Sequence, residues 1–331
     1  MSNKVDLSIV IATYNRCHSL KGAIESALAQ EAPESTFEVI VVDNNSTDGT
    51  SDLVHSMIGS ASGRLHYEFE PRQGVSYARN RGIAASTAPI IAFMDDDVRP
   101  APNWIATIKR VFDDHRGIDL VGGKVLPVWQ CQPPSWLTRD HWMPLALLDY
   151  GNHPIHLDSS SRIGLISANC AIRKNVLVKA GGFRPELQRV RDNIGSMEDH
   201  ELFDRLFRAG AQGLYWPAMQ VSTLTGPDRL TMSYHRKWHF NHGYFFALFR
   251  ASELEKTRTG YLFQVPAHLF RQMGVDAILW LKFSASLQPD KAFACENRLR
   301  FFAGFFWQRF REWCRSQGAA SLSSNRRPSA P

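Results

Sequence analysis

The sequence predicts an α/β fold in which a mostly parallel central sheet is flanked by helices and followed by a helical C-terminal extension. Short apolar runs rich in β-branched residues alternate with helix-like segments over the first hundred residues. Polar clusters follow three of these runs, and beyond residue 230 the pattern becomes helical and aromatic. The 331 residues, of which 44% are hydrophobic and 21% charged, suffice for one large domain or two closely packed ones.

Four strands and three helices are expected in the first hundred residues. The strands are 7–12, 38–43, 65–69 and 90–94, and the helices between them run from about 19–30, 50–58 and 74–85. Thr13-Tyr14-Asn15-Arg16 follows the first strand, Asp43 to Gly49 the second, and Asp95-Asp96-Asp97 the fourth. Ligands of such sheets bind at the carboxyl ends of the strands, so these three clusters predict one shared crevice.

The second half of the chain is less regular. The pattern loosens from about 119 to 183, and the Trp- and Pro-rich stretch 129–156 is interpreted as a long loop, of the kind that often serves as a lid or acceptor surface. A helix is expected from about 199 to 209, after which 215–217 leads out of the compact part. Farther on, 266–283 and 298–313 are the clearest helices, and the polar residues 316–331 are expected to be disordered.

The positive charge is concentrated near the C-terminal end. The net charge is +6, and residues 251–331 hold twelve Lys and Arg against six Asp and Glu, whereas the first 250 residues hold 26 of each. This asymmetry disfavours a nucleic-acid reader and favours a tail that touches an anionic surface. No apolar run is long enough to span a membrane and the start lacks a signal-peptide layout, so a cytoplasmic location is expected. The five cysteines form no CxxC pair, which indicates reduced thiols.

Asp95-Asp96-Asp97 is the strongest candidate for a metal site. Three adjacent carboxylates repel one another unless a cation or hydrogen-bond donors offset their charge. Mg²⁺ and Mn²⁺ bind carboxylate and phosphate oxygens, usually through one or two protein carboxylates while a substrate diphosphate supplies other ligands. The alternative is a solvated turn in which the aspartates act as caps.

Three further positions have both a chemical and a structural interpretation. Asp43 could accept hydrogen bonds from a base or ribose, or could be a turn residue. Arg79 could reach a diphosphate, or could form a surface salt bridge. Glu198-Asp199 begins a helix, whose amino end would keep the carboxylates ionised. An ionised carboxylate in a cleft can act as a general base, but an acidic pair that only caps a helix is as common.

Six segments in a particular order carry a resemblance to a known family. They are Ser8 to Arg16, Val41 to Thr50, Gln73 to Gly82, Ile91 to Asp97, Asn169 to Phe183, and Glu198-Asp199 with Glu201-Leu202. In this order and spacing they resemble a family 2 glycosyltransferase of the GT-A fold, from Ser8 to about Ala247. The resemblance implies a catalytic domain at 1–230, with a nucleotide-sugar half at about 1–118 and an acceptor half at 119–230. A basic, aromatic helical region at 231–315 and a tail at 316–331 would follow.

The resemblance also implies the roles of individual residues. Asp199 matches the catalytic base, Glu198 would support it, and Asp97 and Asp95 are the third and first positions of the metal-binding Asp-x-Asp motif. The nucleotide sugar would be held by Thr13, Tyr14, Asn15, Asp43, Arg79, Asp95 and Asp96. The expected reaction is a single inverting displacement with Mg²⁺ or Mn²⁺, from a nucleotide sugar, with UDP-sugars first, to a saccharide or lipid-linked acceptor. The expected role of this transfer is in cell-surface polysaccharide or glycolipid synthesis.

One departure from the family pattern concerns a histidine. Relatives often carry one shortly before a Pro-acid-Arg-Leu-Thr segment, where it completes the metal or diphosphate site. Residues 218–231 contain no histidine, so the third metal contact stays open. His235, His239 or His242 could replace it, or could be surface and core residues.

The aromatic segment Phe301 to Trp307 is too short to span a bilayer but is surrounded by arginines. It suits a helix that lies in an anionic membrane interface, so peripheral contact through 266–315 at the inner face of the cytoplasmic membrane is expected. Packing of these aromatics on the catalytic domain is an equal alternative.

Two other functions compete with the transferase interpretation. One is an Asp-x-Asp phosphatase with Asp95 as nucleophile and Asp97 as acid, although such pairs follow the first strand of their core and here three strands precede. The other is a catalytically silent nucleotide-sugar-binding protein.

Overall fold

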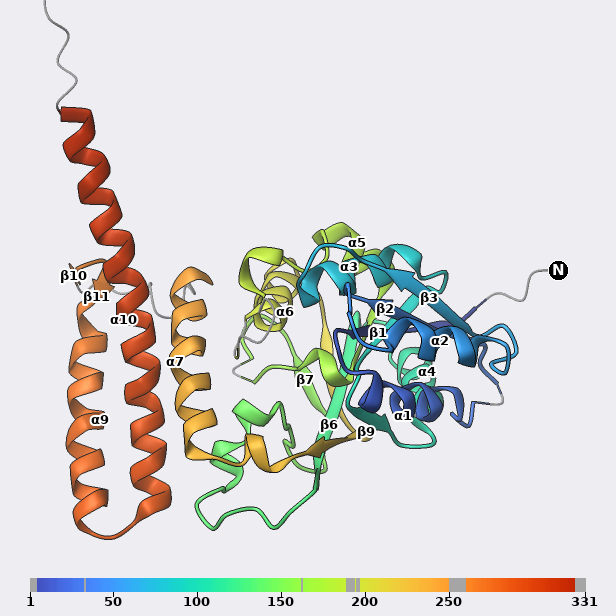
Figure 1. Cartoon of the computed structure of the whole chain (residues 1–331), viewed down its shortest axis with the longest axis horizontal. Helices are drawn as coiled ribbons and strands as arrows, with labels where there is room; N and C mark the ends of the chain where they lie inside the picture. Colours follow the sequence, from blue (N-terminus) through green and yellow to red (C-terminus); the bar gives the residue numbers. More distant parts are fainter. Residues whose placement is uncertain are drawn as a thin grey trace, which may run out of the picture. The chain divides into compact units, whose positions relative to one another are not determined.

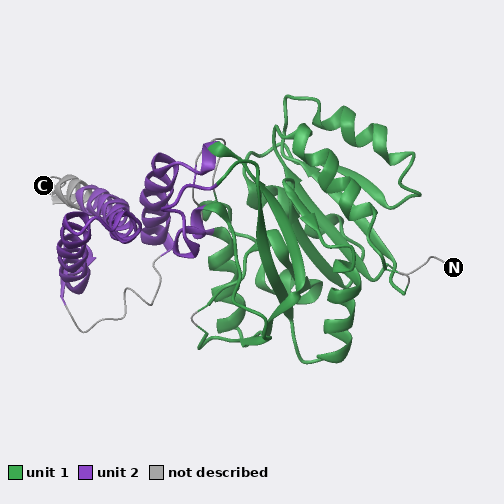
Figure 2. Ribbon diagram, turned by 90° about the horizontal axis from the view of Figure 1, so that it is seen from below, with its two compact units in different colours: residues 1–132, 145–193, 198–227 green, residues 133–144, 194–197, 228–331 purple. Residues whose placement is uncertain are grey.

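The computed structural model describes residues 5–32, 34–161, 163–188, 194, 197–249 and 260–324. They fall into two compact units, which are described separately. Unit 1 contains residues 1–132, 145–193 and 198–227, and unit 2 contains 133–144, 194–197 and 228–331 (Figure 2).

The first half of the sheet in unit 1 is parallel. Its strands are β1 (Leu7–Thr13), β2 (Phe37–Asp43), β3 (Leu65–Phe69) and β4 (Ile90–Asp95), arranged in the order β3-β2-β1-β4. All pairs among them are parallel. Every residue of β2 is buried, as expected for a strand that is covered by helices on both faces. The four strands match those predicted from the sequence to within a residue at either end.

The second half of the sheet is mixed. Its strands are β5 (Val98–Pro100), β6 (Leu120–Trp129), β7 (Ile155–Leu157), β8 (Cys170–Arg173) and β9 (Gly213–Thr225). The order continues from β4 as β8-β6-β9-β5, with β7 beside β9. The β8 strand is antiparallel to β4 and β6, whereas β6 and β9 are parallel. The mostly parallel α/β fold is therefore confirmed, and the antiparallel pairs lie in this half.

The expectation that 215–217 leads out of the compact part is wrong. Tyr215 is fully buried in β9, where its hydroxyl donates a hydrogen bond to the Gly151 carbonyl at 3.1 Å. A proline removes a ladder donor and is tolerated in a sheet mainly at edges or bulges. Pro217 lies where the register between β6 and β9 shifts, between the pairs Gly122–Tyr215 and Lys124–Gln220. The irregularity accommodates the proline, and the strand continues beyond it.

Helices cover both faces of the sheet (Figure 1). They are α1 (Cys17–Leu28), α2 (Thr50–Ile58), α3 (Val75–Ala85), α4 (Trp104–Asp114), α5 (Lys174–Ala180) and α6 (Glu198–Arg208). In α1 the buried residues are Leu20, Ala23, Ile24 and Ala27, a spacing of three and four that places them on one face. The stretch 129–156 is irregular apart from the end of β6, two short 3₁₀ turns at Arg139–His141 and Met143–Leu145, and the start of β7.

Two glycines set the position of α3. Gly74 precedes the helix with φ of 138°, a conformation that favours glycine, and a Cβ there would overlap the Gln188 side chain. A Cβ at Gly82 would overlap the Val10 side chain of β1. Because α3 lies this close to the sheet, Arg79 is carried to the strand ends.

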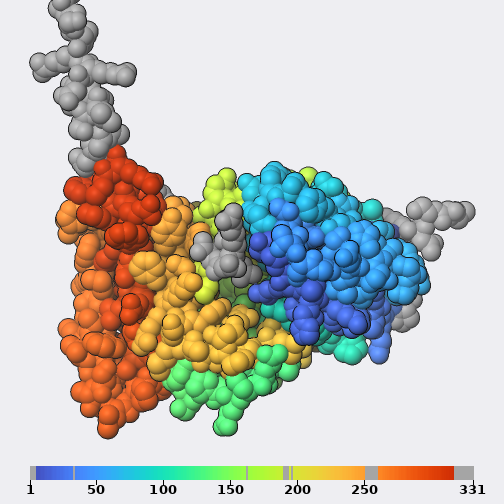
Figure 3. All heavy atoms as spheres, viewed as in Figure 1, coloured from blue at the N-terminus to red at the C-terminus, as the bar shows by residue number. Residues whose placement is uncertain are grey.

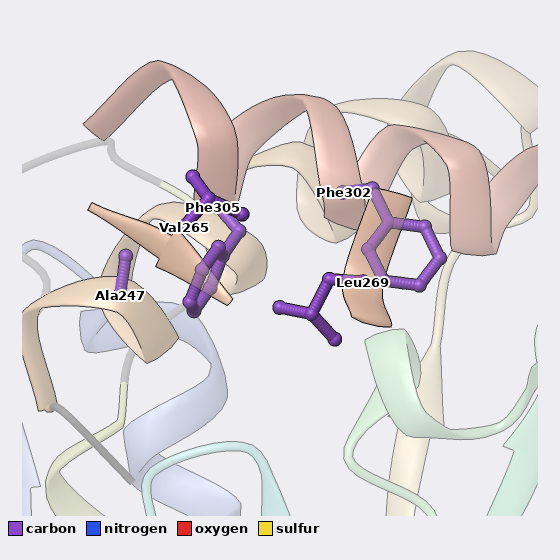
Figure 4. Packing of buried hydrophobic residues seen from close by; sticks show 5 residues of the cluster. All are labelled: Ala247, Val265, Leu269, Phe302 and Phe305. Atoms are coloured by element: carbon purple, nitrogen blue, oxygen red, sulfur yellow. The ribbon is translucent and has the colours of Figure 1, made fainter. Parts of the chain in front are cut away.

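Unit 2 contains the helices α7 (Met232–Phe249), α9 (Ala267–Ala285) and α10 (Pro289–Ser324). The α10 helix lies between the other two (Figures 1 and 2), and the short strands β10 (Tyr261–Leu262) and β11 (Val265–Pro266) precede α9. A Cβ at Gly304 would overlap the Phe240 carbonyl, so glycine permits α7 and α10 to approach closely. The core of the three helices is formed by Ala247, Val265, Leu269, Phe302 and Phe305 (Figure 4).

This core changes the interpretation of the C-terminal aromatics. Phe302 and Phe305 are buried between α10 and its neighbours, so they are not available as a membrane-facing surface. Arg309, one of the arginines near this aromatic segment, is also fully buried. None of the helices in the described ranges is both long and apolar enough to cross a membrane. Of the tail expected to be disordered, 316–324 belong to α10 and 325–331 lie outside the described residues.

Candidate active site

The polar clusters that follow the parallel strands lie at one edge of the sheet. The register pairs Thr13 of β1 with Asp43 of β2, and Ala12 of β1 with Asp95 of β4. Because these strands are parallel and adjacent, their carboxyl ends meet, as the sequence predicted.

The loops after β1 and β2 are connected by hydrogen bonds. Asn15 has φ of 51° and Asn45 has φ of 62°, left-handed conformations that asparagine adopts more readily than most residues. The Asn15 side-chain oxygen accepts a hydrogen bond from the Thr47 amide at 2.7 Å, and the Asn15 amide donates one to the Ser46 hydroxyl at 2.9 Å. Both loops are thereby held as one surface next to Tyr14, which is half-buried.

Asp43 has the turn role that the sequence offered as one alternative. One carboxylate oxygen accepts a hydrogen bond from the Ser46 amide at 2.9 Å, and the other accepts one from the Tyr67 hydroxyl at 2.9 Å. The residue is 2% exposed. Its carboxylate is thus fixed within the loop, and a ligand could reach it only through the remaining lone pairs.

The middle aspartate of the triplet connects β1 and β4. Asp96 is buried and accepts hydrogen bonds from the Thr13 hydroxyl at 2.8 Å and from Arg16 at 3.2 Å. Burial raises the pKa of Asp96 to about 6, although Arg16 and the Thr13 hydroxyl favour its ionised form. Asp96 therefore positions the strand ends.

Asp95 and Asp97 are the more accessible members of the triplet. Their side chains are 36% and 20% exposed. Arg16 pairs with Asp97 at 3.0 Å, and Arg79 pairs with Asp95 at 3.3 Å. Two arginines thus offset part of the repulsion among the three carboxylates.

Arg79 joins the triplet to the acidic pair on α6. One guanidinium nitrogen donates to Glu198 at 3.1 Å and to Asp199 at 3.0 Å, and the other donates to Asp95. The side chain is only 7% exposed, so these ion pairs are buried rather than on the surface. Burial opposes the charge on Arg79, but the three carboxylates outweigh this effect and raise its pKa.

Ser167 holds the second oxygen of Asp199. Its hydroxyl donates to Asp199 Oδ2 at 2.7 Å and its backbone amide donates to the same oxygen at 2.9 Å. Ser167 begins the 3₁₀ turn Ser167–Asn169, which is anchored by a hydrogen bond from the Trp104 indole to Asn169 at 2.7 Å. The sequence analysis did not identify Ser167 as a site residue. The only indication in the sequence was that Ser167 lies two residues before Asn169, where one of the six family-like segments begins.

The predicted site residues form one connected group in unit 1. Thr13 and Arg16 both donate to Asp96, and Arg16 also donates to Asp97. Asp95, Glu198 and Asp199 all accept from Arg79. Asp95 and Asp96 are neighbours in the chain and so connect the two halves. Asn15 and Asp43 lie in the adjoining loops.

The donor set suits a hard divalent cation. Asp95 and Asp97 offer partly exposed carboxylate oxygens, and Mg²⁺ commonly binds one or two protein carboxylates together with substrate phosphates. Within the ranges that the structure describes, no group of three His, Cys, Asp or Glu side chains is arranged to hold a metal ion. His235 is fully buried against Trp136 and Phe293 of unit 2, and burial lowers its pKa to about 4, which matches the core alternative.

Comparison with known proteins identifies relatives of the chain. The model of the family described as glycosyl transferase family 2 matches residues 8–179, just over half of the chain. A glucosyl-dolichyl phosphate glucuronosyltransferase from Haloferax volcanii is 26% identical over 194 residues, which cover 56% of this chain and 58% of that protein. The chain spans about half the length of the relatives that it matches in sequence.

Solved structures share the fold at low sequence identity. TarS 1-349 from S. aureus in complex with UDP has a TM-score of 0.54 and 18% identity, and the match covers 92% of each chain. The mannosyltransferase PcManGT from Pyrobaculum calidifontis, in complex with GDP-Man and Mn²⁺, has a TM-score of 0.55 and 15% identity. That match covers 97% of this chain and 76% of the other.

Proposed function

Because the chain belongs to glycosyltransferase family 2 and has the GT-A fold, we propose that it transfers a sugar from a nucleoside-diphosphate sugar to a hydroxyl group with inversion at the anomeric carbon. The observation that carries this proposal is the buried Arg79, whose guanidinium binds Asp95 at a strand end and Asp199 on α6. A carboxylate suited to proton transfer is therefore held next to carboxylates that could bind a metal ion shared with a diphosphate.

We assign the donor to the 1–118 half of a catalytic domain at 1–230. Thr13, Tyr14 and Asn15 would contact the nucleoside from the end of β1 and the loop after it, and Asp43 and Asp95 from the two neighbouring strands. Related folds have been solved with UDP, with UDP-GlcNAc and with GDP-Man. A UDP-sugar is our first expectation for this chain.

Asp97, together with Asp95, would hold Mg²⁺ or Mn²⁺. When bound there, the ion would neutralise the negative charge that builds on the departing diphosphate. Arg16 is 44% exposed, so its guanidinium could give up Asp97 to the ion while it keeps its hydrogen bond to the buried Asp96. Mn²⁺ is present in the complexes of two proteins with similar folds, which supports this assignment.

Asp199 would act as the general base. Its carboxylate takes the proton of the acceptor hydroxyl as the hydroxyl oxygen forms a bond to the anomeric carbon. The bond from that carbon to the diphosphate oxygen breaks on the opposite face, and the nucleoside diphosphate leaves with the electron pair. Arg79 orients the Asp199 carboxylate through one oxygen, and Ser167 fixes its other oxygen.

The acceptor is assigned to the 119–230 half of the domain. We propose a saccharide or a lipid-linked saccharide in cell-surface polysaccharide or glycolipid synthesis. The relative from Haloferax volcanii supports the lipid-linked alternative, because its name specifies a glucosyl-dolichyl phosphate. Family membership and the position of the triplet after the fourth strand both argue against the phosphatase alternative.

A donor screen tests the proposal. UDP-, GDP- and dTDP-sugars would each be incubated with the protein and Mn²⁺ or Mg²⁺, and both nucleoside-diphosphate release and thermal stability would be measured. We expect one base to give metal-dependent hydrolysis and a higher melting temperature, both lost on addition of EDTA. If no donor raises the melting temperature with either metal, the assignment of this edge of the sheet to a nucleotide sugar is wrong.

A further inference from the structure

One side of α9 is apolar and exposed. Val275, Ile278 and Leu281 are 51%, 67% and 60% exposed. They are three residues apart, so they lie on the same side of the helix, and Arg271 and Lys282, both exposed, share that side. We call these five residues the α9 face. The α9 helix forms part of the surface of unit 2 in Figure 3, where it is coloured orange.

The opposite side of α9 forms the contact with the rest of unit 2. Leu269 is fully buried in the core shown in Figure 4. Asp276 is also buried and accepts a hydrogen bond from Arg298 of α10 at 2.8 Å. The packing of α9 therefore does not require the α9 face. Contiguous exposed apolar side chains of this kind mark an interaction surface more often than isolated ones do.

The exposed charges of the segment that contains α9 are of one sign. Between Gly260 and Gln288 the chain contains one carboxylate, Asp276, and this group is buried and paired with Arg298. Arg271 and Lys282 therefore face solvent without an acidic neighbour in that segment. A partner that combines anionic groups with an apolar layer would match both features.

We propose that the α9 face docks on a bilayer that contains anionic lipids, with the helix lying in the plane of the interface. Val275, Ile278 and Leu281 would enter the boundary between head groups and acyl chains, and the two cations would contact lipid phosphates. A second copy of the chain fits less well, because pairing two α9 faces would bring Arg271 and Lys282 of one copy toward the same cations of the other. The inference goes beyond the proposed reaction, since lipid binding and sugar transfer can be measured separately.

Vesicle sedimentation of the full chain tests the surface. The protein would be mixed with vesicles of phosphatidylcholine alone or of phosphatidylcholine with phosphatidylglycerol, then centrifuged. Two surface cations imply about thirtyfold stronger partitioning to the anionic vesicles at low salt, and this preference should fall as salt is added. Absence of the chain from the anionic vesicle pellet at low salt would overturn the proposal.

Matched variants locate the contact. The double substitution Ile278→Asp and Leu281→Asp should abolish sedimentation, whereas Val178→Asp on α5 should not change it, although Val178 is also 59% exposed. Circular dichroism would show that both variants are folded, and donor hydrolysis without vesicles would report the transferase separately. Unchanged sedimentation of the double variant would contradict the assignment. A wild-type dimer in analytical ultracentrifugation that the double variant loses, with no vesicle binding by either, would assign the face to a second copy instead.

Discussion

Replacing Ser167 with alanine should lower kcat and leave the KM for the donor nearly unchanged. Asp199 receives three hydrogen bonds: from the Ser167 hydroxyl at 2.7 Å, from the Ser167 amide at 2.9 Å and from Arg79 at 3.0 Å. The substitution removes only the first. The proposed base keeps its pair with Arg79, but its orientation is less restricted.

The size of the effect follows from the type of bond and its exposure. A hydrogen bond to a charged group contributes about 1.5–3 kcal/mol. The Asp199 side chain is 24% exposed, so water can replace part of what the hydroxyl supplies. With this discount the loss is about 1–2 kcal/mol, which corresponds to a decrease in kcat of about five- to thirtyfold.

Steady-state release of nucleoside diphosphate at varied donor concentration measures this change. Ser8→Ala is a matched control, because the buried Ser8 hydroxyl also donates to a carboxylate, that of Glu38 at 2.6 Å, but at the other end of β1. The control should lower thermal stability without changing kcat. An unchanged kcat in Ser167→Ala, or an equal decrease of kcat in Ser8→Ala, would show that Ser167 does not position the base.

Three other substitutions have defined outcomes. Arg79→Leu leaves three carboxylates without their shared cation and should lower the free energy of unfolding, measured by urea titration, by about 3–5 kcal/mol. The control Arg81→Leu, on the exposed side of the same helix, should change the free energy of unfolding by less than about 1 kcal/mol. Asp97→Asn should weaken the Mn²⁺-dependent increase in melting temperature given by the nucleoside diphosphate, and an unchanged increase would exclude Asp97 as a metal ligand. Gly304→Ala should cost about 1–3 kcal/mol because its Cβ would overlap a backbone carbonyl of α7, whereas Gly274→Ala, with open space around it, should be neutral or stabilising.

The sequence predicted those parts of the fold in which local pattern and tertiary position agree. The runs ending at Thr13, Asp43 and Asp95 are apolar and β-branched, and buried parallel strands require that composition. Because neighbouring parallel strands end at the same edge of the sheet, the predicted strands also predicted that their polar clusters lie together. The GT-A assignment depended on the order and spacing of six sequence segments, and no single strand would have been sufficient for it.

The remaining features depend on contacts between distant segments. Pro217 argued against a strand, and only the register shift opposite Gly122 and Lys124 shows why β9 tolerates it. Arg79 pairs with Glu198 and Asp199, which lie 119 and 120 positions farther along the chain. No local sequence pattern can predict partners at such a separation. Phe302 is buried although its segment was expected to face a membrane, because helical periodicity places apolar residues on a face without saying which neighbour covers it.

The most direct test of the proposed chemistry compares the transfer rate and the donor affinity of Asp199→Asn with those of the wild type. The amide keeps the size of the side chain but cannot accept the proton of the acceptor hydroxyl. We expect transfer to fall by a factor of about 10² to 10⁴, while calorimetry gives a donor Kd close to that of the wild type. Transfer at the wild-type rate would mean that another group removes the proton and that the carboxylate beside Arg79 has a structural role alone.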